Sequence, residues 1–230
     1  MNLGEIMMKM NATENENDNS FVKNDVLRVI QSDNRKQVDF YLINDIEDIH
    51  DYIDFLREVR DCRQGDLITV HINCYGGNVD VALNIYDELK MSEADVKISV
   101  EGMCASCASM IMLSGDLWNV YPHSRVMIHA WSGVECGKWN EIVAQHNYDK
   151  DIFEFQFREL YKDFLTTDEI EDCIKGKDFF FDCDETIKRL NSFKRKDIEY
   201  EKMIKKITDK YSEKANKEIE SFLKKNKIKG

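Results

Sequence analysis

Two side chains near the middle of the chain have the chemistry of a nucleophile and its base. Ser106 follows Gly102-Met-Cys-Ala, between a β-rich run and an apolar helical run, and His129 ends the β-rich run Ser124-Arg-Val-Met-Ile-His129. A serine hydroxyl is a weak nucleophile at neutral pH, so it needs a nearby base that takes its proton. An imidazole can act as that base. The pair therefore predicts serine hydrolase chemistry, with Ser106 as nucleophile and His129 as general base.

Acyl transfer also needs fixed N–H donors that hold the negative charge developing on the carbonyl oxygen. A glycine pair, Gly76-Gly77, ends 29 residues before the serine. Glycine lets the chain turn tightly and approach a substrate without a Cβ atom in the way. Cys107 follows the nucleophile at a predicted helix start, where backbone N–H groups are unpaired. We therefore predict that the N–H groups of Gly77 and Cys107 form the oxyanion hole.

A repeated strand–turn–helix pattern must position these residues. Its strands are predicted over 67–73, 96–102, 118–121 and 125–129, and its helices over 78–91 and 105–114. Such alternation indicates right-handed crossovers and a mainly parallel sheet. Ligands of parallel sheets bind beyond the carboxyl ends of the strands. Because Gly77, Ser106 and His129 all fall at strand ends or just past them, the pattern predicts one shared site.

Further elements flank this pattern. Strands are expected over 26–30 and 38–43, and helices over 45–59 and 139–164, with a short helix starting at Thr166 or Thr167. His50 falls on the polar side of the first of these helices and is expected to be solvated. The helix over 139–164 has more aromatic residues than one small core needs, which favours contact with another subunit over core packing alone.

Composition limits the class of protein. The chain has 230 residues, 43% hydrophobic content and a formal net charge of −12. These values allow one domain with appendages and disfavour general nucleic-acid binding. No apolar run is long enough for a membrane span, and no signal peptide is expected. The odd number of scattered cysteines predicts free thiols in the cytoplasm. Cys104-Ala-Ser-Cys107 is read as small residues in a tight turn, with a metal or redox role as the alternative.

The two ends differ in character from the body. Residues 1–20 are polar and are predicted to form a disordered tail, with a docking role as the alternative. Residues 194–230 hold 13 Lys and Arg against 7 Asp and Glu, with apolar residues at helical spacing. They predict a basic amphipathic helix that packs on the acidic body or on a neighbouring subunit. Nucleic-acid or membrane binding is the alternative. The predicted division is therefore 1–20, 21–190 and 191–230.

The same motifs carry a family resemblance over about residues 35–190. Ile72-Asn-Cys-Tyr-Gly-Gly77 resembles the Ile-Asn-Ser-Pro-Gly-Gly motif of the proteolytic subunit of the Clp protease family. Gly102-Met-Cys-Ala-Ser106 is similar to its Gly-x-Ala-Ala-Ser turn, and Ser124-Arg-Val-Met-Ile-His129 to its Ser-Arg-x-Met-Ile-His segment. The resemblance implies an α/β fold, the ClpP/crotonase-like spiral of β-β-α units, in which the helix over 139–164 is a protruding handle.

The resemblance also implies a catalytic triad and its partners. Lys177-Asp178-Phe-Phe180 fits the family's Arg-Asp-x-Phe stretch, so Asp178 becomes the third member, with Asp182 and Asp184 as runners-up. The family activity is cleavage of unfolded polypeptides inside stacked heptameric rings, fed by an AAA+ unfoldase. No cofactor or metal is expected, and ATP is expected only on the unfoldase, because the chain lacks a phosphate loop.

The chain departs from the family motifs at two turns. Tyr75 replaces the usual proline, and Cys107-Ala108 replaces Met-Gly after the nucleophile. Two alternatives to a peptidase stay open, and the altered turns bear on the second of them. One is an enzyme of the same spiral fold that acts on acyl thioesters such as acyl-CoA. Ser106 and His129 speak against this first alternative, because that chemistry generally uses carboxylates. The other is a non-catalytic or capsid-processing ring subunit.

Overall fold

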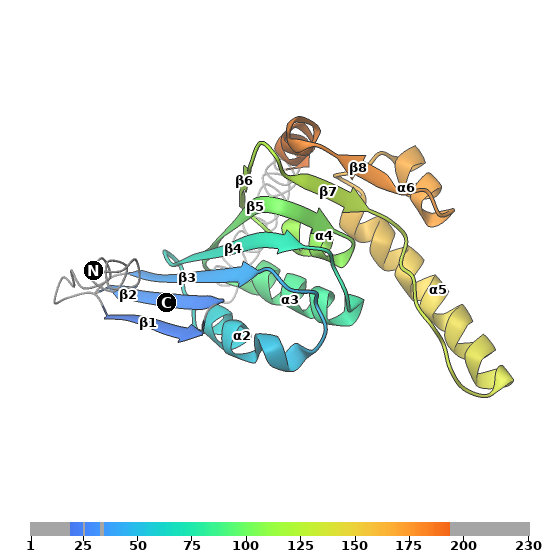
Figure 1. Cartoon of the computed structure of the whole chain (residues 1–230), viewed down its shortest axis with the longest axis horizontal. Coiled ribbons are helices and arrows are strands. Elements are labelled where there is room, and N and C mark those ends of the chain that lie inside the picture. Colours follow the sequence, from blue (N-terminus) through green and yellow to red (C-terminus); the bar gives the residue numbers. More distant parts are fainter. Residues whose placement is uncertain (1–18, 25, 33–34, 194–230) are drawn as a thin grey trace, which may run out of the picture.

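A mixed sheet forms the centre of residues 19–24, 26–32 and 35–193, the part of the chain that the computed structural model describes (Figure 1). Its order is β1-β2-β3-β4-β5-β7-β8, and β6 also pairs with β5. The strands are β1 (Asn19–Asn24), β2 (Leu27–Ser32), β3 (Arg35–Leu42), β4 (Leu67–Cys74), β5 (Asp95–Ala105), β6 (Leu117–Val120), β7 (Arg125–Ile128) and β8 (Phe179–Phe181).

The middle of the sheet is parallel and its two flanks are antiparallel. Strand β4 lies between β3 and β5, and β5 pairs with β6 through Lys97–Val100 and then with β7 through Met103–Ala105, all in parallel. The parallel sheet predicted over residues 67–129 is therefore confirmed. The hairpins β1-β2-β3 and the antiparallel pair β7-β8 were not predicted, and they make the whole sheet mixed.

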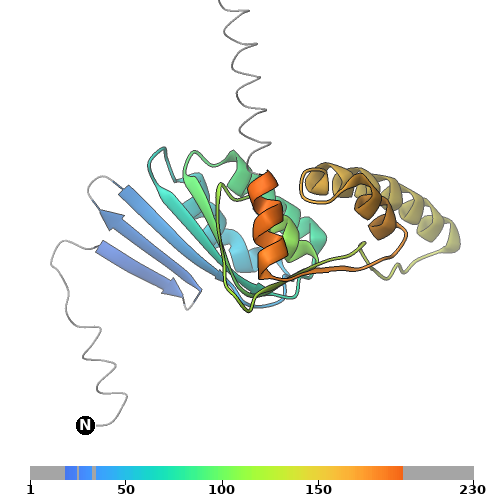
Figure 2. The same ribbon diagram turned by 90° about the horizontal axis from the view of Figure 1, so that it is seen from above.

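Three helices pack against one face of the sheet (Figures 1 and 2). They are α2 (Ile53–Arg60), which follows the 3-10 helix η1 (Ile49–Tyr52), α3 (Val79–Met91) and α4 (Cys107–Met112). Helix α3 begins as predicted, because the Asn78 side chain accepts hydrogen bonds from the N–H groups of Asp80 and Val81. Its buried residues lie at helical spacing: Val81, Ala82, Ile85 and Leu89.

Three predicted helices are shorter in the structure, and the one expected over 139–164 ends at Tyr161. The helix expected over 45–59 begins only at Ile49, because the backbone of Ile46 is extended and pairs with the glycine turn. Ile46 N–H donates to the Gly76 carbonyl at 2.8 Å, and its carbonyl accepts from Asn78 N–H at 2.6 Å. The helix expected over 105–114 covers only Cys107–Met112, because β5 continues to Ala105. His50 is exposed, as predicted.

Helix α5 (Trp139–Tyr161) protrudes from the body as the predicted handle, and only its last turns are buried (Figure 1). The side chains of Phe157 and Tyr161 enter the core. Helix α6 (Thr167–Ile174) follows, and Thr166 and Glu169 form its capping box. The chain then forms β8 and a helix over residues 183–193.

The predicted terminal segments lie largely outside the described residues. Strand β1 begins at Asn19, inside the segment predicted to be a disordered tail, so at residues 19 and 20 that prediction was wrong. Residues 1–18 and the predicted basic helix over 194–230 are not described, so both stay predictions. Within the described ranges, no helix has both the length and the apolarity that crossing a membrane requires.

Candidate active site

Ser106 lies in a strained turn between β5 and α4. Its φ of 55° makes it the only residue other than glycine with a positive φ in the described part of the chain. Such a conformation costs about 1–3 kcal/mol, so the surroundings must hold it. The Ser106 N–H donates to the Met127 carbonyl at 2.9 Å, and its own carbonyl accepts from the N–H of Ser109 at 2.9 Å. The turn places the serine just past the end of β5.

His129 immediately follows β7, which lies beside the end of β5. Because Ala105 and Met127 are register partners in the two parallel strands, the residues that follow them meet at the same edge. The His129 Nε2 atom lies 2.7 Å from the Ser106 Oγ atom. This distance lies within the reach of a general base for a hydroxyl proton. The structure thus brings together the two residues that were singled out from sequence.

The glycine turn lies directly against the nucleophile. A Cβ atom at Gly76 would be 2.7 Å from the Ser106 Cβ and 2.9 Å from the Ala105 carbonyl oxygen, and the φ of Gly76 is +104°. A Cβ atom at Gly77 would overlap the carbonyl of Ile46, and its φ is +142°. Both positions therefore require glycine. Gly77 is the predicted oxyanion donor, whereas the close approach of Gly76 to the serine was not foreseen, although the Gly-Gly pair was its signal.

Cys107 starts α4, which gives its N–H the position expected of the second donor. Its thiol is buried, and burial raises its pKa to about 12. Burial also raises the pKa of Cys104, whose register partner across β4 and β5 is Cys74. All three thiols belong to the hydrophobic core, so they stay protonated and pack as apolar groups. In the ranges described, no group of three or more His, Cys, Asp or Glu side chains could hold a metal ion.

Asp178 lies at the neighbouring strand, one position before β8. Ile128 pairs with Phe179 in the antiparallel ladder of β7 and β8, so the next position places Asp178 opposite His129. The Asp178 side chain is exposed, and within the described residues no hydrogen bond joins it to His129. The runner-up Asp182 instead accepts a hydrogen bond from the N–H of Glu185 at 2.9 Å, and Asp184 is exposed on the following helix. The register favours Asp178.

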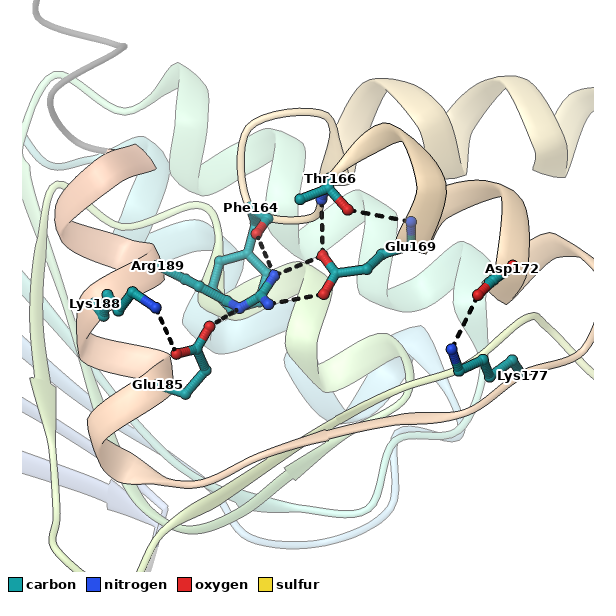
Figure 3. A network of polar contacts seen from close by, with 8 residues as sticks. All are labelled: Phe164, Thr166, Glu169, Asp172, Lys177, Glu185, Lys188 and Arg189. Atoms are coloured by element: carbon teal, nitrogen blue, oxygen red, sulfur yellow. Dashed lines mark hydrogen bonds and ion pairs between the residues drawn. The ribbon is translucent and has the colours of Figure 1, made fainter.

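An ion-pair network fixes the elements on both sides of β8 (Figure 3). Arg189 donates to both carboxylate oxygens of Glu169 at 2.8 Å each and to Glu185 at 2.7 Å. Its guanidinium also lies 4.4 Å from the centre of the Phe181 ring. The hydrogen bonds from Arg189 are the main reason that the pKa of Glu169 falls to about 2. The network ties α6 to the helix over 183–193 and so holds β8, which follows Asp178 directly.

A pocket of about 260 Å³ opens beside the Ser106–His129 pair. Its wall is mainly apolar and comes from α3, α4, α5 and the end of α6. The Trp131 ring stacks on Phe153 with 4.8 Å between the ring centres along this wall. Besides Ser106 and His129, the polar lining comes from His146, Lys150, Glu154 and Gln156. The apolar side chains that line the pocket are Val79, Leu83, Met110, Ala130, Trp131, Phe153, Phe157, Leu160 and Ile174.

The fold and the site define a mixed α/β protein with a hydrogen-bonded serine–histidine pair at the carboxyl edge of its parallel strands. A family model described as Clp protease matches residues 44–189, and the chain belongs to this family. The resemblance and the predicted α/β fold class are thereby confirmed.

The relatives are similar over only part of their length. The ATP-dependent Clp protease proteolytic subunit of Bacteroides fragilis (strain ATCC 25285) is 34% identical over 108 residues, which cover 46% of this chain and 49% of that protein. The subunit of the same name from Pleurastrum terricola is 38% identical over 78 residues, which cover 33% of this chain and 40% of that protein. The matched region thus spans half or less of each relative.

Proposed function

We propose that the chain is a serine endopeptidase subunit that cleaves unfolded polypeptides. The observation that carries this proposal is the 2.7 Å contact between Ser106 Oγ and His129 Nε2 beside an apolar pocket. The strained turn at Ser106 supports it, because such strain gathers at functional sites. Family membership and the names of the relatives as proteolytic subunits support it as well.

In the proposed mechanism, His129 Nε2 takes the hydroxyl proton as Ser106 Oγ bonds to the carbonyl carbon of the scissile peptide. The carbonyl oxygen becomes negative and is stabilised by the N–H groups of Gly77 and Cys107. His129 then gives its proton to the leaving amine, which leaves an acyl ester on Ser106. A water molecule, activated by the same imidazole, hydrolyses the ester. As the ester is hydrolysed, His129 takes a proton from the water and returns it to Ser106 Oγ, which restores the starting state.

Asp178 is proposed to complete the triad. A carboxylate that accepts the Nδ1–H of His129 would fix the ring tautomer and stabilise the imidazolium. Asp178 lies one register step beyond the Ile128–Phe179 pair, opposite His129, and we propose that a rotation of its side chain brings the carboxylate to Nδ1. Substrate binding or subunit assembly would favour that rotation by removing water from the exposed carboxylate.

The pocket indicates which side chains the subunit accepts next to the cleaved bond. An apolar wall and a volume of about 260 Å³ suit a large hydrophobic side chain such as Leu, Met or Phe. A chain segment must be extended to place such a side chain in the pocket and its carbonyl at Ser106. We therefore propose unfolded polypeptides as the substrate class.

The outer part of α5 supports the proposed assembly. Tyr148, Ile152 and Phe155 recur at spacings of four and three residues on one face of α5, and their side chains are 65%, 38% and 64% exposed. An exposed apolar face of this kind marks an interaction surface. We propose that it joins two rings, with heptameric rings stacked face to face in the cytoplasm. An AAA+ unfoldase partner would bind ATP and supply the polypeptide.

The proposal is tested with fluorogenic peptides that carry either Leu or Asp before the cleaved bond. The wild type should cleave the Leu peptide, and Ser106→Ala and His129→Ala should each lose about 10⁴-fold or more in kcat. Ser32→Ala is the control, because Ser32 is an exposed serine at the opposite end of the sheet. An assembled wild type that cleaves neither peptide would favour the non-catalytic ring subunit, and undiminished activity in Ser106→Ala would favour another enzyme class.

A further inference from the structure

Two buried hydroxyl groups lie directly behind the nucleophile. Ser109 in α4 is fully buried, and Tyr161, the last residue of α5, is 1% exposed. Their oxygen atoms are 2.6 Å apart, and Ser109 Oγ is also 2.6 Å from the carbonyl oxygen of Ser106. Hydroxyl groups in an apolar core are costly unless they are hydrogen-bonded, so this chain of contacts fixes the position of both side chains.

The direction of the hydrogen bonds follows from the groups involved. The Ser106 carbonyl can only accept, so the single hydroxyl proton of Ser109 is donated to it. Tyr161 must then donate its own proton to the Ser109 oxygen. Burial raises the pKa of Tyr161, which keeps the phenol protonated as this donor requires. The chain therefore runs from Tyr161 through Ser109 to the carbonyl of Ser106.

That carbonyl belongs to the same peptide unit as the N–H of Cys107. A peptide unit is planar, and its C=O and N–H point in opposite directions. The N–H and the Oγ of Ser109 both hold the Ser106 oxygen, at 2.9 Å and 2.6 Å. Together they fix the direction of the Cys107 N–H. Because the Ser106 backbone is strained, this orientation depends on such external contacts.

We infer that Ser109 and Tyr161 are positioning residues that aim the Cys107 N–H at the substrate oxyanion and tie its orientation to the end of the handle helix α5. This inference rests on the proposed function. It predicts that losing either hydroxyl weakens the oxyanion hole and leaves the Ser106–His129 pair in place. It also links the handle to the site by hydrogen bonds, because Tyr161 is the last residue of α5, the helix whose exposed face includes Tyr148 and Phe155.

The test is peptide hydrolysis by Ser109→Ala, Tyr161→Phe and the double variant. Each single variant should lower kcat about tenfold to a hundredfold with KM nearly unchanged, because an oxyanion donor acts mainly in the transition state. In the double variant, Tyr161→Phe should add little to the loss from Ser109→Ala, because the chain of hydroxyl groups is already broken.

Ser114→Ala is the matched control. Ser114 is 1% exposed and donates to the Ile111 carbonyl at 2.7 Å just past the end of α4, but it has no contact with the nucleophile. It should lower the melting temperature about as much as Ser109→Ala and leave kcat within about twofold of the wild type. Wild-type kcat in Ser109→Ala and Tyr161→Phe, an equal kcat loss in Ser114→Ala, or fully additive losses would overturn the inference. A wild type that cleaves no peptide would overturn the proposed function itself, and this failure is distinct from an active wild type whose Ser109 and Tyr161 variants keep full activity.

Discussion

The ion pair between Glu169 and Arg189 should make a measurable, pH-dependent contribution to stability. The two side chains are 22% and 16% exposed, and two hydrogen bonds of 2.8 Å join them. The pKa of Glu169 falls from the ordinary 4.5 to about 2, mainly through the hydrogen bonds from Arg189. At about 1.4 kcal/mol per pKa unit, this corresponds to about 3 kcal/mol of folding free energy at neutral pH.

The perturbation is Glu169→Gln, which keeps the size of the side chain and removes its charge. At pH 7 the variant should lose about 3 kcal/mol, which lowers the melting temperature by about 6–12 °C. Because the pKa of Glu169 is lower in the folded state, its contribution is complete above about pH 4.5 and is lost as the pH falls towards 2. The stability difference between wild type and variant should therefore shrink across that window.

The assay is thermal unfolding followed by circular dichroism at pH 7, 5, 4 and 3. Glu159→Gln is the matched control, since Glu159 pairs with Lys162 at 2.7 Å but the two side chains are 54% and 56% exposed. Such a surface pair contributes less than about 1 kcal/mol. The reasoning is refuted if Glu169→Gln is no less stable than Glu159→Gln at pH 7, or if its deficit is the same at pH 3 as at pH 7.

Three further predictions concern the site. Gly76→Ala should abolish peptide cleavage with the fold retained, because the new Cβ would lie 2.7 Å from the Ser106 Cβ. The control Gly65→Ala should stay active, because Gly65 also has a positive φ, of +97°, but no atom lies within 4 Å of its added Cβ. Equal activity in both variants would contradict this prediction. Met110→Glu should raise KM for Leu peptides at least about tenfold by placing a charge in the apolar pocket, and an unchanged KM would exclude the pocket as the substrate site. Asp178→Asn should lower kcat by about 10²–10⁴-fold and Asp182→Asn by less than about threefold, and the reverse order would assign the triad to Asp182.

The elements with local signals were predictable from the sequence. Asn78 followed by apolar residues at helical spacing predicted α3, and the structure shows the capping bonds that this spacing implies. The meeting of Ser106 and His129 was predictable because both follow strands of one parallel sheet, and the structure makes those strands neighbours. In both cases the determining interactions are short-range or follow from the direction of the strands.

Features that depend on distant contacts were not predictable. The periodic residues of 45–59 suggested an earlier helix start, but Ile46 is held extended by the glycine turn about 30 residues away in sequence. The contact between Ser109 and Tyr161 joins residues 52 positions apart, and neither residue stands out in its own segment. The orientation of the Asp178 side chain likewise depends on its surroundings and not on its motif.

The central claim is that His129 activates Ser106 as a nucleophile. The most direct test is covalent labelling of the assembled protein with a fluorophosphonate. Mass-spectrometric peptide mapping identifies the labelled residue, and the labelling rates of wild type and His129→Ala are compared. We predict a single adduct on Ser106 that forms at least about a hundredfold more slowly in the variant. No adduct on Ser106, or the same rate with and without the imidazole, would contradict the account.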